Sequence, residues 1–326
     1  MDRTADVQGP APMRGEPPLA GGRSRQRRLL WHQVKRNRWA YLFISPFFIL
    51  FLVFGLFPPL YSFFLSFHEW DVISPMKSVG LENYARVLST GIFWKACLNN
   101  FILILMSTLP GLPLALFIAF LLDRYILRAR NLYLAGIFSP AVTSAVAISI
   151  VFAVLFDKRG MVNAGLETLG LAPVMWLLRP WPMKVTLAIL LTWRWLGWNV
   201  VLYLAGLQSI SSELYEAARV DGASTMQMFA RITVPLIRPT LLYTVIISGI
   251  GMLQLFTEPY LLTGAQGGAG LGGRGNSLLT MFMYLYHSAF RQFEFGYAAA
   301  VSYVMFVLIL LLSLVNLRLV GRSSEA

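Results

Sequence analysis

The chain has 326 residues, of which 57% are hydrophobic and only 13% are charged, and its mean hydropathy is +0.63. A water-soluble domain carries about 25% charged residues, so this composition excludes an ordinary soluble protein and predicts one embedded in a lipid bilayer. The net charge of +12 does not indicate nucleic-acid binding, because most of the charges flank apolar runs and act as orientation signals. The single Cys97 cannot form an internal disulfide or a thiolate metal site, so no metal is expected.

Residues 1–39 are rich in Pro, Gly and Arg and show no apolar periodicity, which predicts a disordered basic tail in the cytoplasm. The apolar run that follows is too long for the hydrophobic region of a signal peptide and lacks a small-residue cleavage site. We therefore expect an uncleaved anchor, with residues 40–320 forming one transmembrane domain and residues 321–326 a short cytoplasmic tail.

Six segments are long and apolar enough to cross a hydrocarbon core of about 30 Å, which takes roughly 20 helical residues. The predicted fold class is therefore an all-α integral membrane protein with six transmembrane helices. Prolines inside several of these segments predict kinks. The segments are 41–65, 99–122, 132–156, 184–208, 240–263 and 297–317.

The positions of Lys and Arg predict the orientation. A basic cluster from Arg23 to Arg38 directly precedes the first span, and the loops that would then be cytoplasmic hold the larger share of the remaining basic residues. Because cytoplasmic flanks are enriched in Lys and Arg, both termini are expected on the cytoplasmic side of a bacterial plasma membrane.

Two outer segments carry distinctive compositions. Residues 66–98 mix aromatics with charges of both signs, as in a short folded cap or amphipathic helix that serves either as an interfacial anchor or as a docking surface for an external partner. Residues 264–277 are glycine-rich but lack the Lys-Ser/Thr ending of a phosphate-binding loop. No catalytic motif and no nucleotide-binding loop occurs, so the chain is not expected to be an enzyme or to hold a cofactor.

The polar 211–239 segment lies between the fourth and fifth predicted spans. Ser211 and Ser212 can cap a helix that begins at Glu213, and Glu216 suits the positive end of that helix. Leu214 and Tyr215 could anchor such a helix in a partner.

The second half of this segment contains further local signals. Asp221-Gly222 predicts a turn, and Ser224 followed by Gln227 has the spacing of a capping box that starts a second helix. Pro235 and Pro239 are expected to end that helix before the next span. The prediction is a helix, turn and helix on the cytoplasmic face.

The stretch EAARVDGASTMQMFARITVPLIRP resembles the E-A-A loop of ABC importer permeases. The rest of residues 40–318 resembles the maltose-type, or carbohydrate-uptake type 1, branch, in segments such as FTEPYLLTG and LYHSAFRQFEFGYAAA. The chain departs from the family where a compact Gly-Gly-Pro-Gly turn is usual, because GAQGGAGLGGRGNS is longer and lacks the proline. The residues that match the loop motif are Glu216, Ala217, Ala218, Asp221, Gly222 and Ala223.

This resemblance implies the type I ABC importer permease fold and a set of partners. An extracellular or periplasmic solute-binding protein would deliver a sugar, a second permease would complete the pathway, and a dimer of ATPase subunits would bind ATP and Mg. Each ATPase would receive one E-A-A loop in a surface cleft and move the permeases between inward-open and outward-open states. The alternative for the segment is that Asp221-Gly222 is only a turn and its acids are only helix caps.

Arg194 lies about 15 Å along the fourth span from Lys184, near the middle of the bilayer. A charge at that depth is costly and should face a polar cavity or a partner. We hypothesise that Arg194 pairs with Glu258 of the fifth span at the wall of the pathway. The sequence equally allows Arg194 to pair with another subunit or the backbone, and Glu258 to border the outer water.

The resemblance to maltose permease places the sugar between the helices before and after the E-A-A loop, around Leu196, Gly197, Ser248, Met252 and Leu255. Several positions that carry amides in the family are apolar here, so the same sugar is not implied. Ordinary helix packing is the alternative for each candidate. The predicted pathway residues are Trp193, Arg194, Gly197, Trp198, Asn199, Ser248, Met252, Gln254 and Glu258.

Two other classes of function remain as alternatives. A secondary transporter should show ion-coupling carboxylates or broken helices in related halves, and the halves of this chain are not visibly related. A membrane scaffold without transport is a further alternative. Within the importer interpretation, glycerol phosphate or another polar solute is the rival cargo.

Overall fold

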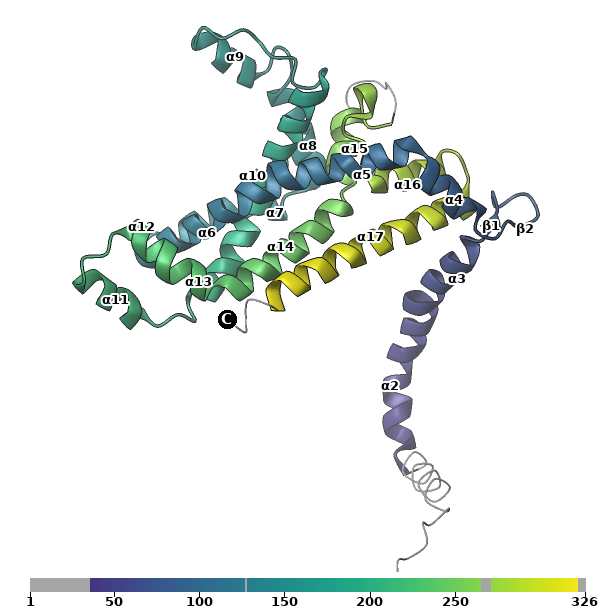
Figure 1. Cartoon of the computed structure of the whole chain (residues 1–326), viewed down its shortest axis with the longest axis horizontal. Coiled ribbons are helices and arrows are strands. Elements are labelled where there is room, and N and C mark those ends of the chain that lie inside the picture. The colour runs from purple at the N-terminus through teal and green to yellow at the C-terminus, as the bar shows by residue number, and fades with distance from the viewer. Residues whose placement is uncertain (1–35, 127, 265–270, 322–326) are drawn as a thin grey trace, which may run out of the picture. The chain divides into compact units, whose positions relative to one another are not determined.

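The computed structural model describes residues 36–126, 128–264 and 271–321, so most of the predicted tails 1–39 and 321–326 and the centre of the glycine-rich loop lie outside the described residues. The chain divides into two compact units, Met1–Tyr61 and Ser62–Ala326 (Figure 1). Among the described residues, four helices are long and apolar enough to cross a membrane, or six if each of two bent pairs counts as one span.

The described part of the first unit, from residue 36 on, is one apolar helix. It comprises α2 (Arg38–Leu50), a π-helical stretch η1 (Phe51–Leu56) and the first residues of α3 (Phe57–Leu65). None of the side chains of α2 and η1 is buried. A helix that is apolar all round suits a lipid environment, in agreement with the predicted first span.

The longest helices of the second unit include three further spans. The first runs without interruption from Gly91 to Arg124, through α5 (Gly91–Leu103), η2 (Ile104–Thr108) and α6 (Leu109–Arg124). It begins eight residues before the predicted start at residue 99, since residues 91–98, which are mainly apolar and contain Lys95, continue the helix. The other two are α10 (Pro180–Leu207) and α17 (Phe295–Gly321).

Two predicted spans are broken. The prediction of one helix over 132–156 is corrected, because α7 (Arg130–Val142) and α8 (Ala145–Leu155) meet at 95°. Likewise, α14 (Arg238–Leu253) ends before α15 (Thr257–Gly264), so residues 240–263 do not form one helix. Pro259 lies in the first turn of α15, where its missing N–H disturbs the helix least, whereas Pro140 lies inside the last turn of α7, where it removes a helix hydrogen bond just before the break.

The break between α14 and α15 is held by polar side chains from distant helices. The amide of Asn100 donates to the carbonyl of Met252 at 2.5 Å, and the hydroxyl of Thr280 donates to the carbonyl of Leu255 at 2.6 Å. Both Asn100 and Thr280 are fully buried. Since an unpaired carbonyl in an apolar medium is costly, these two contacts make a non-helical break possible within the fold.

Helix α10 packs along both α6 and α7. Small residues of α6, such as Ala115 and Ala119, lie in one buried cluster with Val200 and Tyr203 of α10. Gly197 allows the close approach of α7, because a Cβ there would lie 2.6 Å from the Cα of Phe138. Figure 1 also shows α14 and α17 running side by side.

The remaining short elements lie at the ends of the long helices. β1 (His68–Glu69) pairs with β2 (Lys77–Ser78), and the amphipathic helix α4 (Glu82–Ser89) follows, as the mixed composition of residues 66–98 predicts. The others are α9 (Met161–Thr168), η4 (Arg274–Asn276) and α16 (Met281–Phe290). Between α10 and α14 lie α11 (Ser212–Val220), α12 (Thr225–Met228), η3 (Phe229–Thr233) and α13 (Val234–Leu236).

Candidate functional site

The 211–239 segment begins with the predicted cap. The hydroxyl of Ser211 accepts a hydrogen bond from the backbone N–H of Glu213 at 3.2 Å, so α11 starts at Ser212. The carboxylate of Glu213 stands in the first turn, where the helix dipole favours it. In Figure 1, α11 and α12 lie together near the end of α6.

The turn after α11 is also as predicted. Gly222 has φ +75°, and the N–H of Ala223 reaches back to the carbonyl of Ala218 at 2.9 Å, which is the closure typical of a glycine-terminated helix. Ser224 and Gln227 form the complete capping box that starts α12. Helix, turn and helix therefore follow from local sequence alone.

The second helix ends between Pro235 and Pro239, before the next span, as predicted, although Pro235 itself lies inside the helix. The helix continues through η3 and α13 to Leu236, and the bend of 72° into α14 falls at Ile237. In η3 the backbone bonds span five residues, with the N–H of Val234 bonded to the carbonyl of Phe229. This wider turn accommodates Pro235, which lacks the N–H needed for a regular helix. Pro239 lies in the first turn of α14, a position that tolerates proline.

One face of the 211–239 segment is fixed to the rest of the chain. Tyr215 is 2% exposed, and its hydroxyl shares a hydrogen bond of 2.9 Å with the buried hydroxyl of Thr233. The guanidinium of Arg124, at the end of α6, lies 3.8 Å from the centre of the Tyr215 ring. Tyr215 is therefore an internal contact, and the expectation that it anchors a partner is corrected.

The opposite face is open to solvent. Glu216, Ala217, Asp221 and Gly222 are exposed, and their side chains form no hydrogen bond or ion pair within the part of the chain that the structure describes. Ala218 and Ala223 are half-buried beneath them. The helix–turn–helix thus exposes small and acidic residues while its inner face is attached to α6.

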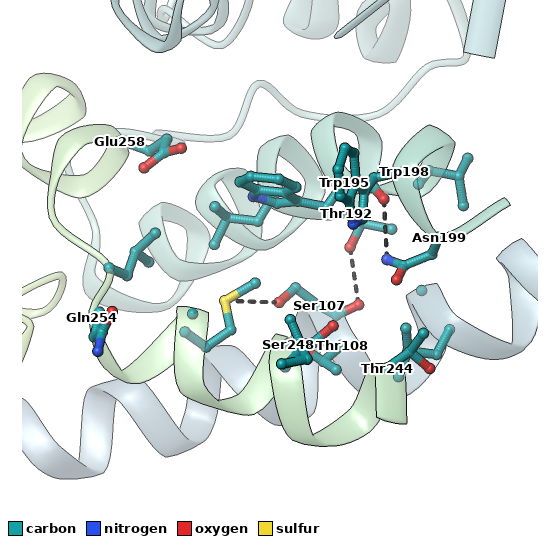
Figure 2. A pocket seen from close by; sticks show the side chains of 18 of the residues that line it. Ser107, Thr108, Thr192, Trp195, Trp198, Asn199, Thr244, Ser248, Gln254 and Glu258 are labelled. Carbon is teal, nitrogen blue, oxygen red and sulfur yellow. Dashed lines mark hydrogen bonds between the residues drawn. The ribbon is translucent and has the colours of Figure 1, made fainter. Parts of the chain in front are cut away.

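A cavity of about 330 Å³ lies between η2, α6, α10, α14 and α15. Its polar lining consists of hydroxyls, amides and one carboxylate, and two indoles stand beside them (Figure 2). This volume lies at the lower end of the range for small-molecule sites. The labelled lining residues are Ser107, Thr108, Thr192, Trp195, Trp198, Asn199, Thr244, Ser248, Gln254 and Glu258.

The structure brings six of the predicted pathway residues to this cavity. They come from α10, from α14 and from the break and first turn that follow it. Figure 2 shows Gln254 and Glu258 toward one end and Asn199 toward the other. The six are Trp198, Asn199, Ser248, Met252, Gln254 and Glu258.

The other three predicted pathway residues do not line it. Trp193 points toward α8, where its ring centre lies 5.7 Å from that of Phe152. Gly197 is occupied by its contact with α7. Arg194 does not line the cavity, but it bonds to Glu258, which does. The residues on either side of Gly197 in α10 line the cavity, but Gly197 itself does not.

Several lining residues were missed from the sequence. Ser107 and Thr108 belong to the π-helical stretch η2, and Thr192 donates to the carbonyl of Ser107 at 3.3 Å. Trp195 lies one residue beyond Arg194, a position that the predicted set skips. A period of three to four residues through Thr192, Trp195 and Asn199 could have identified this face of α10.

Some polar groups of the cavity have no partner. Thr108, Ser248 and Gln254 form no side-chain hydrogen bond within the described residues, and the hydroxyl oxygen of Thr108 is fully buried. Asn199 uses its amide nitrogen to bond the carbonyl of Trp195 at 3.0 Å, which leaves its oxygen available. Gln254 is exposed and Ser248 is half-buried, so their free groups can reach a hydroxylated ligand in the cavity, whereas the buried hydroxyl of Thr108 is enclosed by the chain itself.

The hypothesised ion pair is confirmed as a contact. Nη1 of Arg194 donates to Oε1 of Glu258, and the side chains are 13% and 6% exposed. The described residues hold no cluster of His, Cys, Asp or Glu suited to a metal ion. The site therefore offers binding and positioning by neutral polar groups, with one internally neutralised pair.

Apolar helices that enclose a mainly apolar cavity with several polar groups, joined to an exposed helix–turn–helix, are typical of a membrane subunit of a transport system. The family model for the binding-protein-dependent transport system inner membrane component matches residues 85–324. The chain belongs to this family and is a multi-pass membrane transport component.

Curated relatives match most of the chain. The lactose transport system permease protein LacF of Rhizobium radiobacter is 39% identical over 280 residues, which cover 85% of this chain and 91% of that protein. The arabinooligosaccharides transport system permease protein AraP of Bacillus subtilis (strain 168) is 35% identical, with 86% and 88% covered. The trehalose/maltose transport system permease protein MalF of Thermococcus litoralis is 34% identical, with 86% and 93% covered.

A solved structure agrees in fold. One chain of a bacterial ABC transporter involved in the import of the acidic polysaccharide alginate superposes with a TM-score of 0.76 at 25% identity. The match covers 90% of this chain and 98% of that chain. The type I importer permease fold implied by the resemblance is therefore confirmed.

Proposed function

We propose that this chain is a permease subunit of an ATP-driven, binding-protein-dependent importer of a sugar or oligosaccharide. The observation that carries this proposal is the cavity, which unpartnered groups of Ser248 and Gln254 line together with the indoles of Trp195 and Trp198. Sugar rings present C–H faces to aromatic side chains and hydroxyls to hydrogen-bonding groups. The lactose, arabinooligosaccharide and trehalose/maltose systems named for the relatives support the same cargo class.

ATP drives the transport through the 211–239 segment. The exposed group Glu216, Ala217, Asp221 and Gly222 enters a cleft of an ATPase subunit, where Glu216 meets a basic group. ATP and Mg are held by that subunit, and this chain binds no cofactor of its own. Ala218 and Ala223, half-buried and small, let the helices approach the partner closely.

The attachment of Tyr215 to Arg124 suggests how the movement reaches the cargo. Arg124 ends the same continuous helix that carries Ser107 and Thr108 into the cavity. A displacement of the 211–239 segment is therefore transmitted along a packed helix to the binding residues. Coupling of this kind requires an element with two arrangements that the two partners favour differently.

The complete importer contains four kinds of partner. A second permease forms the other half of the pathway, two ATPase subunits bind from the cytoplasm, a solute-binding protein delivers the cargo outside, and lipid surrounds the spans. Both termini of this chain face the cytoplasm of a bacterial plasma membrane. The predicted basic tail 1–39 then lies on the inner side, as the excess of Arg before the first span favours.

Uptake by the intact importer tests the cargo proposal. The complex with its binding protein is reconstituted in liposomes with internal ATP, and entry of radiolabelled disaccharides is measured. The double variant Ser248→Ala with Gln254→Leu should lower sugar uptake at least tenfold. Ser302→Ala is the matched control, because that hydroxyl bonds only within α17, to the carbonyl of Ala299. Undiminished uptake by the double variant would refute the assignment of the cavity.

A further inference from the structure

The buried ion pair at the cavity wall joins two separate elements. Arg194 comes from the middle of α10, and Glu258 from the first turn of α15, directly after the break that follows α14. The contact is made by Nη1 of Arg194 and Oε1 of Glu258. Because both side chains are almost completely buried, the carboxylate neutralises the guanidinium in a region that water screens poorly.

The rest of the cavity lining carries no charge. Among the described residues that line it, Glu258 is the one ionisable acid, and no Lys, Arg or His is present. In Figure 2, Glu258 stands at the edge of the group, away from Asn199 and Thr244. A cargo in this cavity therefore meets neutral hydrogen-bonding groups and one carboxylate, Glu258. The charge of that carboxylate is balanced by Arg194, which does not itself line the cavity.

Arg194 retains unused binding capacity. Its Nε is buried and has no hydrogen-bond partner. Its guanidinium carbon lies 5.3 Å from the ring centre of Trp195, and Trp195 lines the cavity. Guanidinium groups bind carboxylates through two parallel N–H groups, so removal of Glu258 would leave a site suited to an anion beside the cargo space.

We propose that Glu258 makes this cavity selective for uncharged sugars by neutralising Arg194 and by repelling anionic groups of the cargo. The role rests on the proposed sugar-import function and adds the charge class of the cargo to it. An acidic sugar that enters the cavity meets the carboxylate of Glu258 with no free cation to compensate. A neutral sugar of the same size meets no such repulsion and uses Ser248, Gln254 and the indoles.

The test measures binding of two probes to the purified importer complex. The first probe is lactose, and the second is the disaccharide of the same size in which one hydroxymethyl group is oxidised to a carboxylate. Direct titration of the complex avoids the separate selectivity of the solute-binding protein. The wild-type complex should bind lactose at least tenfold more tightly than the acidic disaccharide.

Variants then assign the selectivity to the pair. Glu258→Gln should strengthen binding of the acidic disaccharide at least tenfold relative to lactose. The double variant Arg194→Gln with Glu258→Gln should show a clearly smaller gain, because it lacks the repelling carboxylate but also lacks the cation that attracts the acid. A gain in the double variant as large as that of Glu258→Gln alone would overturn the proposal. If Glu258→Gln does not assemble, the exchanged pair Arg194→Glu with Glu258→Arg serves instead, and it should bind the acidic disaccharide more tightly than the wild type does.

The outcomes separate this proposal from the proposed function. Equal binding of both probes by the wild-type complex overturns the charge selectivity alone and leaves sugar import intact. Binding of neither probe, with assembly of the complex confirmed, removes the assignment of this cavity to disaccharides and the selectivity together.

Discussion

Gly222 provides a test of the 211–239 segment, because a side chain at this position would strain the backbone but would not clash with any neighbour. It has φ +75°, yet a Cβ built on it meets nothing within 4 Å. The variant Gly222→Val therefore adds strain without any clash inside the chain. An L-residue in the left-handed region costs roughly 1–2 kcal/mol, and since each 1.4 kcal/mol is about tenfold, the equilibrium constant for forming the native turn should fall by about fivefold to thirtyfold.

Gly170 is a matched control for this prediction. It also has φ +75° and open space around its Cβ, and its N–H bonds the carbonyl of Glu167 at 3.0 Å, just as that of Gly222 bonds Arg219 at 3.0 Å. Gly170→Val should therefore suffer the same local strain far from the proposed coupling surface. A further variant, Gly222→Asn, should be largely tolerated because Asn adopts this conformation more readily.

The assay compares sugar uptake and ATPase co-purification for these variants at equal amounts of inserted protein. Gly222→Val should lose both by about fivefold or more, while Gly170→Val and Gly222→Asn stay near the wild-type values. Equal losses in the two valine variants would show general damage. Unchanged uptake and unchanged co-purification in Gly222→Val would refute the coupling role of the turn.

Three further outcomes are expected. Gly296→Ala should sharply reduce the yield of monodisperse protein on size-exclusion chromatography, because the new Cβ would overlap the carbonyl oxygen of His68; a normal yield would contradict this packing. Tyr215→Phe removes the hydrogen bond to Thr233 and should weaken the 211–239 segment by about 1 kcal/mol, seen as faster amide hydrogen exchange in α11, whereas unchanged exchange would argue against that contact. Hydrogen bonds from the backbone N–H and hydroxyl of Ser74 lower the pKa of Asp71 below its ordinary 3.8. The turn that these bonds close should therefore stay fully formed above pH 3.8 and open only as the pH falls through the lowered pKa. Titration of Asp71 at the ordinary value, measured by NMR, would contradict this.

Local signals predicted much of the 211–239 segment. The cap at Ser211, the turn at Gly222 and the capping box of Ser224 with Gln227 each depend on neighbours within a few residues. Such patterns are readable because the interacting groups lie close together in the chain. The π-helical turn that carries the helix just past Pro235 could not be predicted, since it has no comparably simple sequence signature.

The cavity was only partly predictable, because its walls come from distant segments. The break between α14 and α15 depends on Asn100 and Thr280, and neither is near it in sequence. Ser107 reaches the cavity because α6 and α10 pack along their lengths. The pairing of Arg194 with Glu258 could be hypothesised from the cost of a buried charge, although the sequence alone did not select that partner.

The sidedness and occupancy of the 211–239 segment test the central claim most directly. Val220, in this segment, is 88% exposed, and Ile73, in the connection between β1 and β2, is 93% exposed. The single native Cys97 is buried, so it should contribute little background labelling. Val220→Cys and Ile73→Cys are labelled separately with a membrane-impermeant maleimide in intact cells and in inside-out vesicles, with and without bound ATPase. The account predicts that Val220→Cys reacts only in inside-out vesicles and is protected by the ATPase, and that Ile73→Cys reacts only in intact cells. Labelling of Val220→Cys from outside, or no protection by the ATPase, would contradict it.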